Sequence, residues 1–113
     1  MESIFETVDI YPTILELCNV SIPHKIDGKS FVDLLSSEIQ SKNNMAYSYF
    51  NQGISVRTEK YRFTKYFRAQ EPIIELYDHM NDPLETINIA DESRGMVNDL
   101  EFILDKGNTG LFD

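Results

Sequence analysis

An α+β fold is predicted by the way apolar residues are spaced along this chain of 113 residues. Near the N-terminus they recur with the three-to-four-residue period of a helix that buries one face. Between 45 and 77 they alternate with polar residues, as in half-buried strands, and after 93 the helical period returns. A polar segment, 36–44, separates the first helical part from the strands. We therefore predict a helical arm, a polar linker, and a small antiparallel sheet of about four strands packed by a C-terminal helix.

The helical arm is predicted to hold one helix, a loop and a second, shorter helix. Asp9 is a candidate N-cap for a helix that runs to about Cys18, and residues 19–29 form the loop. Ser30 is a candidate cap for the short helix, residues 31–35. The first helix, 9–18, carries an apolar stripe made of Ile10, Ile14, Leu17 and Cys18. Because Cys18 belongs to this stripe, we expect a buried, unreactive thiol.

The second half of the chain is predicted to hold the strands and the last helix. Glu59 and Lys60 form the turn of a hairpin, and Gly107 ends the C-terminal helix. The expected strands are 45–50, 54–58, 61–67 and 73–77. The expected helix is 93–106, and its apolar face is formed by Met96, Val97, Leu100, Ile103 and Leu104.

Composition excludes several classes of protein. Hydrophobic residues make up 42% of the chain and charged residues 26%, which argues for a globular protein rather than a disordered one. The net charge of −9 disfavours nucleic-acid binding. No apolar segment approaches the roughly 20 residues that span a bilayer, and the N-terminal residues do not resemble a signal peptide. The single cysteine cannot form an internal disulfide.

No complete catalytic constellation is visible in the sequence. The common phosphate-binding loops and the Gly-x-Ser-x-Gly nucleophile motif are absent. Asp78, His79 and Asp82 together offer ligands for a hard metal ion, but their spacing matches no metal-binding loop that we can derive. Asp82 precedes Pro83, an arrangement typical of a turn in which the carboxylate caps backbone amides. We favour this structural role, and a small enzyme built on the three residues remains the alternative.

Several phrases, taken together and in order, closely resemble the C-terminal part of type I sulfatases. They are VDIYPTILEL at 8–17, IDGKSF at 26–31, LL at 34–35, SVRTEKYRF at 55–63, ELYD at 75–78, NDPLET at 81–86 and NIA at 88–90. These enzymes belong to the alkaline phosphatase superfamily, and the chain is most similar to the iduronate-2-sulfatase-like group. The resemblance implies that residues 1–44 end an α/β catalytic domain and that 45–113 form a C-terminal subdomain with a four-stranded antiparallel sheet and a long terminal helix.

The resemblance also implies that this chain lacks the catalytic machinery. The sulfatase nucleophile lies in a Cys/Ser-x-Pro-x-Arg motif and is converted to formylglycine, but Cys18 is followed by Asn19, Val20 and Ser21. Formylglycine and calcium are therefore implied for a full-length parent enzyme that hydrolyses sulfate esters of a sugar or similar compound. We assign no catalytic, cofactor-binding or metal-binding residue to this chain, and we expect the isolated chain to be inactive. Members of the family that it resembles are often periplasmic, secreted or lysosomal.

The segment 57–70 carries five basic residues and one acidic residue, whereas 71–113 carries two basic and eleven acidic residues. Within the basic segment, Arg57 and Arg62 are candidates for contacts with an anionic substrate. We favour the alternative that they pair with the acidic segment or with the missing catalytic domain.

Three origins are compatible with the sequence: a fragment of a sulfatase, which we favour, a split subunit that docks on a separate catalytic chain, or a free-standing interaction module. The apolar stripe predicts that the isolated chain self-associates through helix 9–18. No nucleic-acid or membrane partner is expected.

Overall fold

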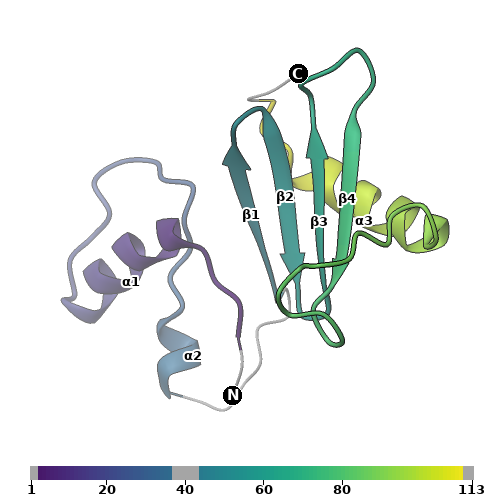
Figure 1. Ribbon diagram of the computed structural model, residues 1–113. Helices are drawn as coiled ribbons and strands as arrows, with labels where there is room; N and C mark the ends of the chain where they lie inside the picture. The colour runs from purple at the N-terminus through teal and green to yellow at the C-terminus, as the bar shows by residue number, and fades with distance from the viewer. Residues whose placement is uncertain (1–2, 37–43, 111–113) are drawn as a thin grey trace. The chain divides into compact units, whose positions relative to one another are not determined.

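The chain divides into two compact units, residues 1–44 and 45–113. The computed structural model describes residues 3–36 and 44–110 (Figure 1). Most of the predicted linker, 36–44, lies outside the described residues.

The first unit contains a 3-10 helix, η1 (Thr7–Asp9), followed directly by helix α1 (Ile10–Leu17). Asp9 is the residue directly before α1, as predicted, but its backbone angles are helical and its side chain makes no capping hydrogen bond to α1. Its carboxylate accepts hydrogen bonds from the backbone N–H of Glu6 at 3.0 Å and of Lys29 at 2.8 Å. Asp9 therefore fastens the loop to the start of the helix.

Helix α2 (Val32–Ser36) ends the described part of the first unit. Ser30 precedes it, and its hydroxyl accepts a hydrogen bond from the Val32 N–H at 3.3 Å, so the helix begins one residue later than predicted. Thr13, which is buried, links α1 to this segment by accepting the Phe31 N–H at 3.0 Å. The rings of Phe5 and Phe31 stack with their centroids 4.6 Å apart.

The apolar stripe of α1 is exposed. Ile14 and Leu17 keep 53% and 61% of their surface accessible, and Ile10 is also exposed. Cys18 is exposed as well, so the prediction of a buried thiol is wrong. The residues of α1 that are buried are Pro12 and Thr13, which lie beside the stripe and not on it.

The second unit is a four-stranded antiparallel sheet with one long helix against it (Figure 1), which confirms the predicted α+β fold. The strands follow the chain order β1-β2-β3-β4. They are β1 (Met45–Phe50), β2 (Gly53–Thr58), β3 (Tyr61–Tyr66) and β4 (Ile73–Asp78), and the helix is α3 (Arg94–Gly107).

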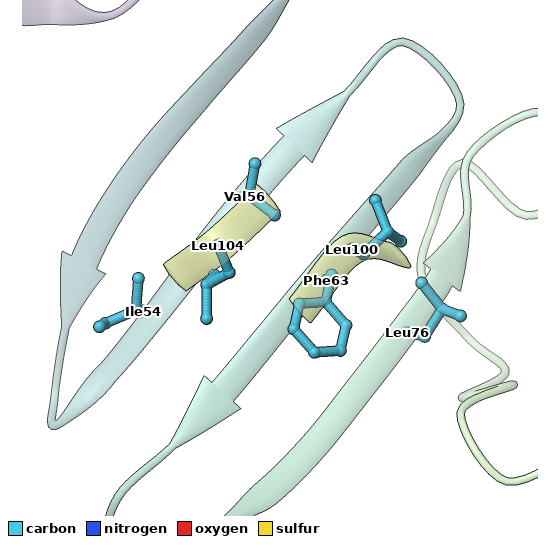
Figure 2. Packing of buried hydrophobic residues seen from close by; sticks show 6 residues of the cluster. All are labelled: Ile54, Val56, Phe63, Leu76, Leu100 and Leu104. Carbon is cyan, nitrogen blue, oxygen red and sulfur yellow. The ribbon is translucent and has the colours of Figure 1, made fainter. Parts of the chain in front are cut away.

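The core of the second unit lies between the sheet and α3 (Figure 2). Val56 faces Phe63 across β2 and β3, and Phe63 faces Leu76 across β3 and β4, so alternate residues of neighbouring strands lie on one face. Leu100 and Leu104 of α3 cover them. The six core residues have at most 3% of their surface exposed: Ile54, Val56, Phe63, Leu76, Leu100 and Leu104.

The end of α3 is fixed by strand β1. Gly107 was predicted to lie just beyond the helix, but it is the last residue of α3. The ring of Tyr47 fills the space where a side chain of residue 107 would stand. A Cβ atom on Gly107 would lie 2.2 Å from that ring. The Tyr47 hydroxyl donates to the Ile103 carbonyl at 3.1 Å and the Tyr49 hydroxyl to the Gly107 carbonyl at 3.3 Å. Tyr49 thus satisfies a carbonyl that the helix end leaves unpaired, and Tyr47 adds a bond one turn earlier.

The outer edge of β4 is covered by Asn88 from the segment that leads to α3. The Asn88 side chain accepts the Leu76 N–H at 3.0 Å and donates to the Ile74 carbonyl at 3.3 Å. The next residue, Ile89, donates its N–H to the Leu76 carbonyl at 2.9 Å. A side-chain amide thus takes the place of a fifth strand and blocks pairing with another chain at this position.

Replacing Asn88 by alanine is expected to destabilise the second unit by about 1–2 kcal/mol, because the Leu76 N–H of a buried residue loses its acceptor. Urea unfolding would measure the loss, and amide exchange at Leu76 would localise it. Asn88→Asp retains the acceptor but not the donor, so it should cost less than Asn88→Ala. Equal losses in the two variants would contradict this account of the edge.

Candidate functional site

The sheet face opposite α3, here called the polar face, carries Arg57 and Arg62 together with other polar side chains. Successive side chains of a strand point to opposite faces, so residues between the core positions share this face. The strand register arranges them in three rows. The rows are Ala46–Arg57–Arg62–Tyr77, Ser48–Ser55–Thr64–Glu75 and Phe50–Gly53–Tyr66–Ile73.

A shallow cavity of about 160 Å³ lies on the polar face. Its lining combines hydroxyl, carboxylate, guanidinium and aromatic groups, among them Ser55, Arg62, Thr64, Tyr66, Glu75 and Tyr77. Glu85, from the segment after β4, also lines it. The cavity is smaller than the roughly 300–1,000 Å³ of pockets that enclose drug-sized ligands.

Arg62 forms an ion pair with Glu85 at the rim of the cavity. The guanidinium Nε lies 2.7 Å from Oε1 of Glu85, and Nε2 of His79 lies 2.6 Å from the same oxygen. Glu85 has a φ of 56°, a left-handed backbone conformation that is uncommon for a residue with a side chain. Glu85 was not among the candidate residues predicted from the sequence, although it lies in the phrase NDPLET at 81–86.

Arg57 lies directly opposite Arg62 in the pairing of β2 with β3. The two candidate residues are therefore close enough to contact one ligand or partner together. Its Nη1 donates to the backbone carbonyl of Thr58 and, at 3.3 Å, to that of Tyr61. Burial and the neighbouring Arg62 charge lower the pKa of Arg57, while Glu85 acts in the opposite direction. The Arg57 guanidinium is thus directed to carbonyls of the turn between β2 and β3.

The middle of the polar face is a hydrogen-bonded group of side chains. The Thr64 hydroxyl donates to the Ser55 hydroxyl at 3.0 Å, and Thr64 is 7% exposed. Burial raises the pKa of Tyr77, and the charge of Glu75 and a hydrogen bond with its side chain raise it further. These groups hold one another in place before any ligand arrives.

The other basic residues of the 57–70 segment do not join Arg57 and Arg62. Lys65 lies on the helix-covered face, where its Nζ is 2.5 Å from a carboxylate oxygen of Glu101. Arg68 lies beyond the end of β3, with its guanidinium carbon 4.2 Å from the centroid of the Tyr66 ring. The alternation of a strand therefore divides this basic segment between two faces.

Asp78 and Asp82 act as caps for the turn after β4. Asp78 accepts the Met80 N–H at 2.9 Å and the Asn81 side-chain N–H at 2.7 Å. Asp82 accepts the N–H groups of Thr86 at 2.8 Å and Ile87 at 2.9 Å. Within the described residues, no three His, Cys, Asp or Glu side chains are grouped as a metal site. The geometry thus favours the structural role over the small-enzyme alternative.

The hydrogen bonds from Ile87 and Thr86 lower the pKa of Asp82 below its usual 3.8. A carboxyl group whose pKa is lower in the folded state stabilises the fold above its unfolded pKa. That contribution is lost as the pH falls below about 3.8 through the folded-state pKa. We expect Asp82→Asn to lose stability less steeply than the unaltered chain below pH 4, as urea unfolding at several pH values would reveal. Parallel pH curves for the two proteins would contradict the expectation.

The comparisons with known proteins assign this chain to the C-terminal domain of the sulfatases. Residues 1–106 match the family model described as N-sulphoglucosamine sulphohydrolase, C-terminal, and the chain therefore belongs to that family.

Relatives and solved structures agree with this assignment. A protein called Sulfatase from Formosa agariphila is 30% identical to this chain over 106 residues, covering 91% of the chain and 20% of the relative. Arylsulfatase K from Xenopus laevis is 28% identical over 117 residues, covering 89% and 22%. The putative sulfatase yidJ from Bacteroides fragilis has the same fold, with a TM-score of 0.78 at 21% identity, over 87% of this chain and 23% of that one. The chain thus spans about a fifth to a quarter of the length of the proteins that it matches.

No helix within residues 3–36 and 44–110 is both long and apolar enough to cross a membrane.

Proposed function

We propose that this chain is the C-terminal part of a sulfatase that hydrolyses a sulfate ester of a sulfated sugar. In this proposal residues 1–44 end the catalytic domain, and 45–113 form a subdomain that supports the substrate cleft. The observation that carries the proposal is the family match over residues 1–106, combined with relatives four to five times as long as the matched segment.

The names of similar proteins support a sulfated sugar as the substrate class. One relative is called Ulvan-active sulfatase, and another Delta 4,5-hexuronate-2-O-sulfatase. A similar structure, with a TM-score of 0.73, holds its substrate D-glucosamine-2-N,6-O-disulfate. We place the chain in the iduronate-2-sulfatase-like group on the phrases quoted above.

The residues of this chain do not fit the two groups on which sulfatase chemistry depends. The four residues after Cys18 are Asn19, Val20, Ser21 and Ile22, which do not form the motif that is converted to formylglycine. A calcium site usually draws on several carboxylates, and the described residues hold no group of three or more His, Cys, Asp or Glu side chains. Calcium and formylglycine would be held by the catalytic domain, and no catalytic step is assigned to this chain.

We further propose that Arg57 and Arg62 make contacts with the catalytic domain of the full-length sulfatase. Both lie on the polar face, in the row nearest the start of β1, where the chain enters the subdomain. The ion pair of Arg62 with Glu85 and the hydrogen bonds of Arg57 to backbone carbonyls support a positioning role over direct capture of a sulfate group. An anionic-substrate contact is the alternative.

The proposed function is tested by sequencing the source DNA several hundred codons upstream of Met1. An in-frame Cys/Ser-x-Pro-x-Arg motif without an intervening stop codon is expected, and sulfatase activity should then be assayed in the longer protein. A stop codon followed by an independent start would overturn the fragment proposal. It would favour a split subunit or a free-standing interaction module.

The isolated chain is expected to self-associate through the exposed stripe of α1, because clustered apolar side chains at a protein surface favour association. Sedimentation at concentrations well above micromolar would show it, and Leu17→Glu should shift the chain toward monomer. Phe102→Glu is a matched control, since Phe102 is as exposed as Leu17 but lies on α3. A monodisperse monomer, or equal effects of both substitutions, would count against this surface.

A further inference from the structure

We propose that the cavity on the polar face binds a sugar ring by hydrogen bonds to the hydroxyl groups of that ring, and does not bind a sulfate group. The proposal rests on the proposed function for its ligand class, a saccharide. It goes further by naming the site and the part of the saccharide that the site holds.

The charges around the cavity favour an uncharged ligand group. Two guanidinium groups, those of Arg57 and Arg62, lie on the polar face together with two carboxylates, those of Glu75 and Glu85. Arg62 is already paired with Glu85 at 2.7 Å. A sulfate group placed here would meet carboxylates as well as cations, so it would gain little Coulomb energy.

The hydrogen-bonding groups of the cavity suit sugar hydroxyls. A sugar hydroxyl both donates and accepts, so it pairs well with a mixture of acceptors, donors and hydroxyls. The cavity offers the Glu75 carboxylate as an acceptor, the Arg62 guanidinium as a donor, and hydroxyl groups that do both. Thr64 and Ser55 at its floor are held by their mutual hydrogen bond at 3.0 Å. Because these groups are ordered in advance, binding costs less conformational entropy.

Two aromatic residues, Phe50 and Tyr66, line the cavity in the row of the sheet that is farthest from Arg62. Phe50 and Tyr66 both line the cavity, and Phe50 keeps 78% of its surface exposed. Gly53 lies between them in the register. A Cβ atom on Gly53 would lie 2.6 Å from the Tyr66 ring, so the ring extends over the glycine. The exposed Phe50 ring can pack against the C–H face of a sugar, and the cavity volume of about 160 Å³ suits a single small ring.

The experiment is an NMR titration of the ¹⁵N-labelled chain with methyl α-D-glucoside, methyl N-acetyl-α-D-glucosaminide and sodium sulfate. We expect at least one glycoside to shift the amide signals of Ser55, Thr64 and Glu75 with a millimolar dissociation constant. We expect sodium sulfate at matched ionic strength to leave these signals in place. Binding of the glycoside should depend little on salt, since the ligand carries no net charge for salt to screen.

Two variants make the assignment specific. Glu75→Gln keeps the shape of the side chain but replaces a carboxylate acceptor with an amide, so glycoside binding should weaken about threefold to tenfold. Glu101→Gln is the matched control on α3, against the opposite face, and should bind as the unaltered chain does. Amide spectra of both variants establish that they are folded.

Three results would overturn the proposal. Sulfate-induced shifts at the same amides, weakened by salt, would make the cavity an anion site. An unchanged dissociation constant for the glycoside in Glu75→Gln would place binding elsewhere. Absence of any shift at tens of millimolar glycoside would exclude the site. Each result is independent of the upstream DNA sequence, so the sugar site and the sulfatase origin can fail separately.

Discussion

Replacing Phe63 by alanine is expected to destabilise the second unit by about 3–5 kcal/mol, the largest effect of any substitution considered for this chain. Phe63 lies on β3, one of the two inner strands, and none of its surface is exposed. Its ring contacts the core that β2, β4 and α3 share (Figure 2). Truncation removes most of a buried ring and leaves a cavity that a sheet paired on both sides cannot close.

Phe102→Ala is the matched control, because the same atoms are removed from a residue that is 62% exposed on α3. Its expected cost is below about 1 kcal/mol. Urea unfolding followed by far-UV circular dichroism would give both values, and amide exchange in β3 would separate the second unit from the first. A loss for Phe63→Ala no larger than that for Phe102→Ala would mean that the sheet and α3 do not pack around this ring.

The strands could be predicted closely because each has one buried and one polar face. The bounds predicted for the first strand, 45–50, are those of β1, and the second is one residue longer than predicted because Gly53 pairs with Phe50. The apolar face predicted for the last helix is confirmed, since its five residues belong to the core or pack against it. The spacing of apolar residues was sufficient to predict these elements because the faces that it indicates are the faces that pack in the core.

Helix ends were less predictable because tertiary contacts decide them. The side chain of Asp9 was expected to cap its own helix, but it bonds to Lys29, twenty residues away. Gly107 was expected to stop α3, but its place is fixed by the ring of Tyr47 from β1. The exposure of Cys18 likewise could not be predicted from the helical period. A stripe indicates which residues share a face and does not say what covers that face.

The candidate site was predictable only in part. Arg57 and Arg62 were singled out from the sequence, and strand alternation could have shown that Lys65 lies on the other face. The partner Glu85 could not be deduced, because it reaches Arg62 through a turn and a left-handed backbone conformation. The polar rows of the sheet depend on strand register, which the sequence alone leaves undetermined where no turn signature is present.

Replacing Gly28 by alanine is expected to disrupt the first unit, at a cost of at least about 2–3 kcal/mol. A Cβ atom at this position would lie 2.0 Å from the carbonyl oxygen of Val8 and 2.6 Å from its carbonyl carbon. Both are backbone atoms of η1, so no side chain can rotate to make room. The loop must move away, and the bond from the Lys29 N–H to Asp9 at 2.8 Å is then lost.

The contrast with Gly95→Ala makes this prediction specific. A Cβ atom on Gly95 meets nothing within 4 Å, and Gly95 lies in α3, where alanine is favoured over glycine by about 0.5–1 kcal/mol. Hydrogen exchange should therefore be faster throughout α1 in Gly28→Ala, unchanged in β3, and no faster than normal anywhere in Gly95→Ala. Normal exchange of α1 amides in Gly28→Ala would show that the loop and η1 are not in the close contact described. The disturbed contact joins Val8 of the phrase at 8–17 to Gly28 of the phrase at 26–31. The same substitution therefore tests why a glycine stands between Asp27 and Lys29.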